Sequence, residues 1–129
     1  MFSFVQSRPT GRKSALWLAG IVVAMAPLAV AAHAILIDSS PAVNAAVGPG
    51  AISFTLRYNS RIDRERSRLT LIAPDQTQTR LPVGPDGPPD IMTTTTAALA
   101  PGDYTVRWQV LAVDGHITRG DVPFTVKAP

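Results

Sequence analysis

The chain has 129 residues, with 12 Lys and Arg against 9 Asp and Glu, and it contains no cysteine. This length suits one domain, and an apolar share of 46% is enough for a packed core, so wholesale disorder is excluded. The lack of cysteine excludes a disulfide-stabilised scaffold, a thiol nucleophile and any cysteine-ligated zinc or iron–sulfur site.

The excess of positive charge belongs to the N-terminal segment. Residues 1–32 hold Arg8, Arg12 and Lys13 and no acid, whereas residues 33–129 carry nine basic and nine acidic side chains. A neutral domain has no field to attract a polyanion, so the sequence predicts that nucleic acid is not a partner.

An apolar run over residues 15–32 follows the basic stretch and ends in Val-Ala-Ala. Positive flank, short apolar stretch and small residues before the cut predict a secretory signal peptide over residues 1–32, cleaved after Ala32. An uncleaved anchor is the alternative, because the run approaches the length that spans a bilayer. Pro27 and the alanine-rich end favour cleavage. A cut one residue earlier, which would leave Ala32 in first place, stays open.

The rest of the chain, residues 33–129, reads as strands and turns. Alternating or β-branched stretches predict strands over residues 34–37, 52–58, 69–72, 77–83, 91–96, 104–110 and 124–126. The charged residues 63–66 predict a solvated loop, and the proline-rich residues 84–89 exclude regular structure. Pro123 predicts that the last strand has an edge position or a bulge.

No window in residues 33–129 has a helical period, so the sequence predicts an all-β domain. About seven short strands in this length are typical of an immunoglobulin-like β-sandwich. The motif Leu99-x-Pro101-Gly102-x-Tyr104 resembles the tyrosine corner of such sandwiches, in which a phenol hydroxyl ties down a crossing loop.

The two histidines are the candidate metal ligands. Cleavage after Ala32 would make His33 the first residue, whose amine and ring nitrogen can chelate one ion. His116 follows Asp114 in an Asp-Gly-His turn, so a second imidazole and a carboxylate could join it. Three nitrogens with an oxygen suit Cu(II), whereas zinc prefers tetrahedral sets. The alternative is an exposed chain end and an ordinary turn.

Both ends of this domain resemble the periplasmic copper-resistance protein CopC family. The matching residues are His33-Ala34-x-Leu36-x-x-Ser39-x-Pro41-Ala42, then Leu99-x-Pro101-Gly102-x-Tyr104-x-Val106-x-Trp108, Asp114-Gly115-His116, Gly120 and Phe124-Thr125-Val126. The resemblance implies a Greek-key, cupredoxin-like β-sandwich in the periplasm. It also implies a Cu(II) site formed by His33, Asp114 and His116.

Two departures from the family pattern are visible. Ser60 stands where some relatives carry a glutamate that assists the copper site, and we do not expect it to be a ligand. Met92 is the single methionine of residues 33–129, whereas some relatives have a methionine-rich loop that binds Cu(I). A lone thioether is usually packing, so we expect a protein that binds Cu(II) only.

The sequence therefore predicts a monomeric periplasmic Cu(II)-binding protein, not an enzyme, that sequesters or delivers copper. The resemblance implies a separate CopD-type inner-membrane protein as partner. One alternative is a copper-dependent polysaccharide monooxygenase. Such enzymes also bind copper through an N-terminal histidine and a second histidine, an arrangement called a histidine brace. Such an enzyme needs an exposed platform for a glycan, whereas all five aromatic residues of 33–129 read as core. A metal-free sandwich for adhesion or scaffolding is the other alternative.

Overall fold

The computed structural model describes residues 33–129, together with Ser3 and Gly20. The signal peptide expected over residues 1–32 otherwise lies outside the described residues. Among the residues that are described, no helix could cross a membrane. The strands, in chain order, are β1 (Leu36–Ser40), β2 (Ala45–Val47), β3 (Ser53–Tyr58), β4 (Ile62–Ile72), β5 (Gln78–Leu81), β6 (Ile91–Thr95), β7 (Gly102–Ala112) and β8 (Ile117–Val126).

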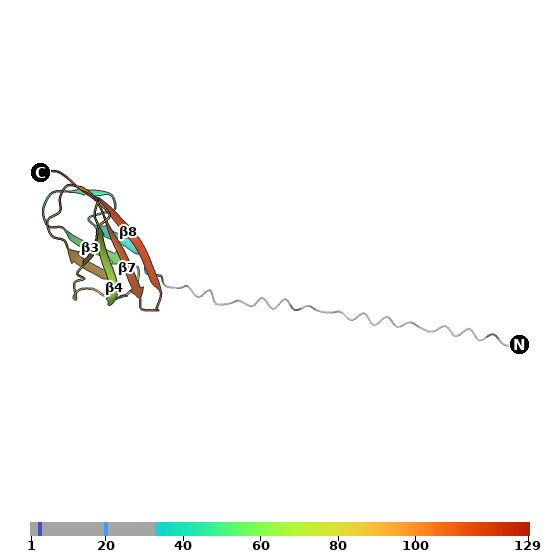
Figure 1. Cartoon of the computed structure of the whole chain (residues 1–129). Helices are drawn as coiled ribbons and strands as arrows, with labels where there is room; N and C mark the ends of the chain where they lie inside the picture. The colour runs from blue at the N-terminus through green and yellow to red at the C-terminus, as the bar shows by residue number, and fades with distance from the viewer. Residues whose placement is uncertain (1–2, 4–19, 21–32) are drawn as a thin grey trace.

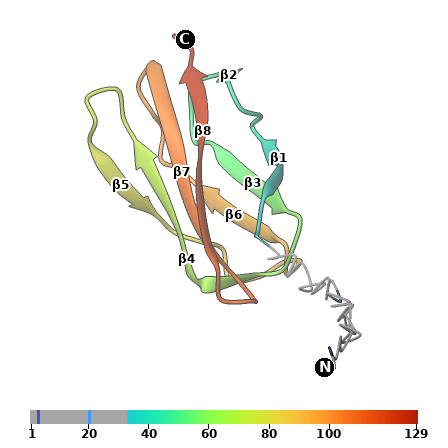
Figure 2. The same ribbon diagram turned by 90° about the vertical axis from the view of Figure 1, so that its right-hand side faces the viewer.

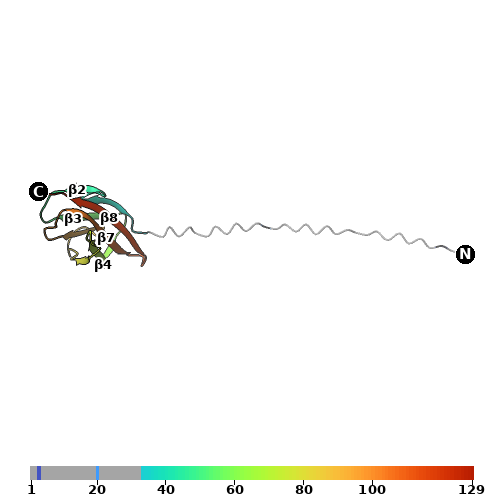
Figure 3. The same cartoon turned by 45° about the horizontal axis from the view of Figure 1, so that its top comes forward.

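These strands form two facing sheets (Figures 1 and 2). The smaller sheet has the order β1-β3-β6 and the larger sheet has the order β2-β8-β7-β4-β5. All pairs are antiparallel except β2 with β8. The predicted all-β Greek-key sandwich is confirmed. It has eight strands rather than about seven, because Ala45–Val47 adds a three-residue strand beside the C-terminal end of β8 (Figure 3).

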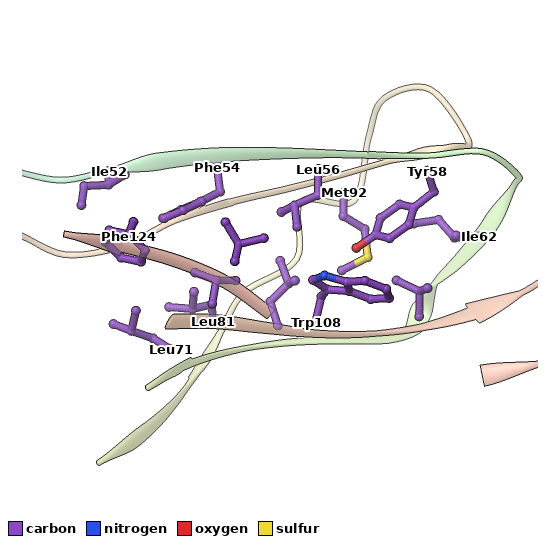
Figure 4. Packing of buried hydrophobic residues seen from close by; sticks show 14 of the residues in the cluster. Ile52, Phe54, Leu56, Tyr58, Ile62, Leu71, Leu81, Met92, Trp108 and Phe124 are labelled. Atoms are coloured by element: carbon purple, nitrogen blue, oxygen red, sulfur yellow. The ribbon is translucent and has the colours of Figure 1, made fainter. Parts of the chain in front are cut away.

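The core lies between the sheets and follows from the two-residue alternation of the long strands. In β3, Phe54, Leu56 and Tyr58 are buried and the intervening residues are exposed. Phe54 packs on Phe124 across the sandwich, with ring centroids 5.1 Å apart, and Tyr58 packs on Trp108 at 5.3 Å (Figure 4). The predicted burial of all five aromatic side chains of residues 33–129 is confirmed.

The tyrosine corner expected at the start of β7 is present. The Tyr104 hydroxyl donates a hydrogen bond of 2.8 Å to the carbonyl of Ala100, four residues upstream. Gly102 has a φ of 150°, a backbone conformation that favours glycine, and it lies against the Pro74 ring. These contacts fix the loop that crosses from the smaller sheet into β7.

The prediction of a solvated loop over residues 63–66 was wrong. These residues belong to β4, where the register with β7 shifts between Asp63 and Arg68, as in a β-bulge. The Arg64 guanidinium donates to the carbonyls of Ile91 at 3.0 Å, Gly87 at 2.8 Å and Pro88. The charge of these residues led to the prediction of an exposed loop. Instead, Arg64 binds carbonyls of the proline-rich residues 84–89, whose prolines have no amide hydrogen to donate to a neighbouring strand.

The bounds of β1 and the position of Pro123 in β8 also differ from the predictions. The first strand was expected over residues 34–37 and to end at Asp38, but β1 runs from Leu36 to Ser40, and Asp38 is paired with Arg57 across the sheet. Pro123 lies in a continuous register with β7, so it marks no bulge there. The expected edge position is also not found, because β8 lies between β2 and β7. The carbonyl of Pro123 accepts a hydrogen bond from the amide of Asn44, so its ring nitrogen faces the segment that leads into β2, on the side away from the ladder with β7.

Replacing Tyr104 by Phe should lower the free energy of unfolding by about 1 kcal/mol, because it removes the hydrogen bond to Ala100. The matched control is Tyr58→Phe. Among the residues that the structure describes, the buried Tyr58 hydroxyl has no hydrogen-bond partner, and burial raises the pKa of Tyr58 well above the ordinary value. Its removal should therefore cost no stability. Urea unfolding of the two variants checks this. Equal losses would contradict the assigned role of the corner.

Candidate metal centre

The turn between β7 and β8 places Asp114 and His116 next to each other. Its backbone closes through hydrogen bonds from Gly115 to Ala112 at 2.9 Å and from Ala112 to His116 at 2.8 Å. Gly115 has a φ of 88°, which glycine adopts without strain. One Asp114 oxygen accepts the amide of His116 at 3.0 Å, the turn-forming hydrogen bond for which aspartate is favoured. The predicted Asp-Gly-His turn is therefore confirmed.

The second oxygen of Asp114 contacts the imidazole of His116. Its distance to Nδ1 is 3.0 Å, and both side chains are partly exposed. Hydrogen bonds from the His116 amide and then from its ring hold the pKa of Asp114 below the usual value. An Nδ1 proton directed at a carboxylate leaves the lone pair of a neutral imidazole on Nε2. The turn thus leaves Nε2 as the atom of His116 that can bind a metal ion.

His33, at the start of the described domain, lies beside His116. The rings of His33 and His116 meet edge to face, with centroids 5.3 Å apart and planes at 70°. Two residues far apart in sequence are thereby brought into contact where the chain enters β1 and the β7–β8 hairpin turns. The sequence contains no other histidine, so both imidazoles of the chain meet at this point.

The backbone beside His33 is held on both sides. Ala34 is fully buried, and its carbonyl accepts a hydrogen bond of 2.6 Å from the Thr118 hydroxyl of β8. The amide of Ile35 donates to the Asn59 side chain at 2.8 Å, and the amide of Asn59 donates back to the Ile35 carbonyl at 3.0 Å. These contacts fix the backbone that directly follows His33.

Sequence reasoning missed Thr118 and Asn59. Thr118 lies in the part of β8 that was not predicted as a strand, and Asn59 directly follows the strand predicted over residues 52–58. Their partners are distant in sequence, so no local pattern indicated them.

The three predicted ligands do not form a ready-made ligand set. Within residues 33–129 no group of three His, Cys, Asp or Glu side chains converges on one point that could hold a metal ion. His33 and His116 meet, whereas both oxygens of Asp114 are engaged by His116 itself. Ser60 directs its hydroxyl to the carbonyl of Arg61 at 3.5 Å. Met92 is fully buried in the core, which confirms its expected role in packing (Figure 4).

Comparison with known proteins agrees with this architecture. Protein YobA of Escherichia coli K12 is 31% identical over 121 residues, which cover 92% of this chain and 98% of that protein. The crystal structure of CopC from Methylosinus trichosporium OB3b has a TM-score of 0.66 and 28% identity, and covers 74% of this chain and 94% of its own. PcoC, a methionine-rich copper resistance protein from Escherichia coli, has a TM-score of 0.61 and 26% identity, and covers 74% and 100%.

The family model of the CopC domain matches residues 36–127. This range contains Asp114 and His116 together with every strand of the sandwich up to the end of β8. His33 lies three residues before it. The match covers more than two thirds of the chain, and the chain therefore belongs to the CopC domain family.

Proposed function

We propose that this protein binds Cu(II) in the periplasm through His33, Asp114 and His116, and sequesters the ion or hands it on. The observation that carries the proposal is the contact between the His33 and His116 rings, 5.3 Å between centroids. Two imidazoles on an exposed surface have no packing reason to meet. Membership of the CopC domain family and the likeness to a copper resistance protein support copper as the ion.

The donor set would be completed by cleavage of the chain after Ala32. His33 would then offer its amine as well as its ring, and His116 would offer Nε2. With an oxygen from Asp114, these groups make a nitrogen-rich set that favours Cu(II) over the other divalent ions of the first transition row. The hydrogen bond from Nδ1 to Asp114 fixes the tautomer of His116, a role that ligand-orienting carboxylates fill at many metal sites.

A second, soft copper site receives no support. Met92 is the single thioether of residues 33–129, and it is fully buried in the core. Thioethers prefer Cu(I), and such a site needs several of them at an accessible place. We therefore propose a protein for Cu(II) alone. We further propose that it acts as a monomer, and that it stores the ion or passes it to a CopD-type membrane protein.

An oxidative enzyme with the same two histidines is not favoured. Glycan-binding surfaces usually present exposed aromatic rings. In residues 33–129 the five aromatic side chains are all buried, with exposed fractions of 8% or less. The described surface thus offers no aromatic platform for a polysaccharide, and we propose that the protein binds and transfers copper rather than catalysing a reaction.

Replacing His116 by Ala should weaken Cu(II) binding by about a hundredfold or more, because a nitrogen ligand is lost. Asp114→Ala should have a smaller effect, since an oxygen is the weaker partner for Cu(II). Both residues lie in an exposed turn, so the thermal midpoint should hardly change. Isothermal titration with Cu(II) measures the affinities. Wild-type affinity in His116→Ala would refute the assignment.

Thr118→Val should weaken Cu(II) binding by about tenfold while retaining every ligand, because the hydroxyl that holds the Ala34 carbonyl is lost. Valine has nearly the same shape, so the core should be undisturbed. Thr125→Val on the same strand is the control, since its hydroxyl contacts Asp103 at the other end of β8. Equal affinities of the two variants would show that the fixed backbone beside His33 does not position the ligand.

Retaining Ala32 in front of His33 should abolish most of the affinity. It keeps both imidazoles and the net charge, but moves the free amine and leaves an amide at His33, which binds copper poorly near neutral pH. The electron paramagnetic resonance spectrum should lose nitrogen character. Binding by the protein that begins at His33 should weaken as pH falls, because protons compete for the amine and the imidazoles.

The intact mass of the exported protein tests the premise of that experiment. A mass that begins at His33 is expected. A mass that includes Ala32 would contradict the proposed site, because the free amine would then not belong to His33. An unchanged affinity of the protein extended by Ala32 would likewise show that the amine is not a ligand.

A further inference from the structure

The outer face of the larger sheet carries a concentration of arginines. Alternation in the strands directs Arg68 of β4, Arg80 of β5, Arg107 of β7 and Arg119 of β8 away from the core. The strand register places them in two adjacent rows: Arg68 lies level with Gln109 and Arg119, and Arg80 lies level with Thr70, Arg107 and Asp121. We call this surface the arginine face.

Three carboxylates lie on the same outer face, and one of them, Asp63, is level with Leu111 and lies 3.8 Å from the Arg66 guanidinium. Asp121 binds Arg107 through both oxygens, at 2.9 and 3.2 Å, and Arg119 is held by the Gln109 side chain at 2.8 Å. Arg68 and Arg80 form no ion pair with any residue that the structure describes. Asp103 faces the same side but at the far end of the sheet, where it accepts the Thr125 hydroxyl.

The outer face of the smaller sheet is different. It presents hydroxyl side chains such as Ser53, Thr55 and Thr95, and its one arginine, Arg57, stands opposite Asp38 in the register. Residues 33–129 as a whole carry equal numbers of basic and acidic side chains. The arginine face is therefore a segregation of charge within a neutral domain.

An apolar row borders the arginine face at the end that carries the metal site. Leu111 and Ile117 are paired at the end of the β7–β8 hairpin, directly beyond the row of Gln109 and Arg119. Ile117 is 52% exposed, and Val113 in the turn is 69% exposed. Aliphatic side chains next to arginines match the boundary between lipid headgroups and acyl chains.

We propose that the arginine face and this apolar row bind the protein to an anionic phospholipid surface. The positive charge is spread over four adjacent strands, about 15 Å across, rather than gathered in one recess. Such a layer fits a plane of mobile phosphate headgroups better than the fixed carboxylates of one protein. Each arginine near an anionic membrane strengthens binding by about fivefold. The proposal does not depend on copper.

Docking in this orientation would bring His116 to the membrane surface, because it lies in the hairpin turn that carries Val113 and adjoins Ile117. This consequence alone rests on the proposed function. It would place copper exchange at the surface in which an inner-membrane partner is embedded.

The test is cosedimentation of metal-free protein with vesicles. The protein begins at His33, so that the apolar residues 15–32 are absent while all eight strands and the whole core are kept. Vesicles of equal parts phosphatidylglycerol and phosphatidylcholine are compared with vesicles of phosphatidylcholine alone. Binding to the anionic vesicles is expected, and it should weaken from about 0.1 M to about 1 M salt as the screening length falls from about 10 Å to about 3 Å.

The variant Arg68→Gln with Arg119→Gln should bind the anionic vesicles about 25-fold more weakly. Arg57→Gln on the other sheet is the matched control and should bind like the wild type. Ile117→Ser should weaken binding at both salt concentrations, because its contribution is not electrostatic. Far-ultraviolet circular dichroism verifies that all variants are folded.

Three results would overturn the proposal: equal binding to neutral vesicles, equal losses in Arg57→Gln and in the double variant, or no vesicle binding at all. Retention on immobilised polyglutamate without vesicle binding would assign the face to an acidic protein instead. Because the protein carries no copper in these measurements, their failure would leave the proposed function untouched.

Discussion

The register between β7 and β8 is the constraint on which the rest of the structure depends. It pairs every residue from Gly102 with Val126 to Leu111 with Ile117 without a shift. One register thus directs alternate residues to the core, sets the length of the turn that ends at His116, and brings Thr118 to the backbone beside His33. Gly120 makes it possible, because a Cβ there would overlap the Trp108 indole. If β8 slipped by one residue along β7, its buried side chains would face solvent and its exposed side chains would face the core.

Much of the fold could be predicted because its strands alternate with a period of two. Phe54, Tyr104 and Trp108 were predicted to be buried from this pattern alone, and their burial follows from it. The pattern failed in two places. The charged residues 63–66 belong to a strand in which Arg64 satisfies distant carbonyls. Ala45–Val47 is too short to show a period and pairs with a strand far along the chain. Long-range pairing leaves no local trace in a sequence.

The sequence nominated His33, Asp114 and His116 as ligands, which stays a prediction, but it did not indicate how the fold arranges them. Two histidines in the chain, one next to an expected cleavage point and one in an Asp-Gly turn, indicated where to look. The hydrogen bond between Asp114 and His116 is local to one turn. The contacts of Thr118 and Asn59 with the backbone next to His33 join segments that only the folded chain brings together. Spacing can nominate ligands, whereas their orientation belongs to the tertiary structure.

The complete burial of Met92 bears on how the domain withstands the chemistry of its proposed cargo. Copper that cycles between oxidation states generates reactive oxygen species, and sulfur atoms are among the first protein groups that these attack. Residues 33–129 contain no cysteine, and their one thioether has an exposed fraction of 0%. The surface of the domain therefore presents no sulfur to oxidise. Methionine sulfoxide, which would place a polar group in the core, can form only when the sandwich opens.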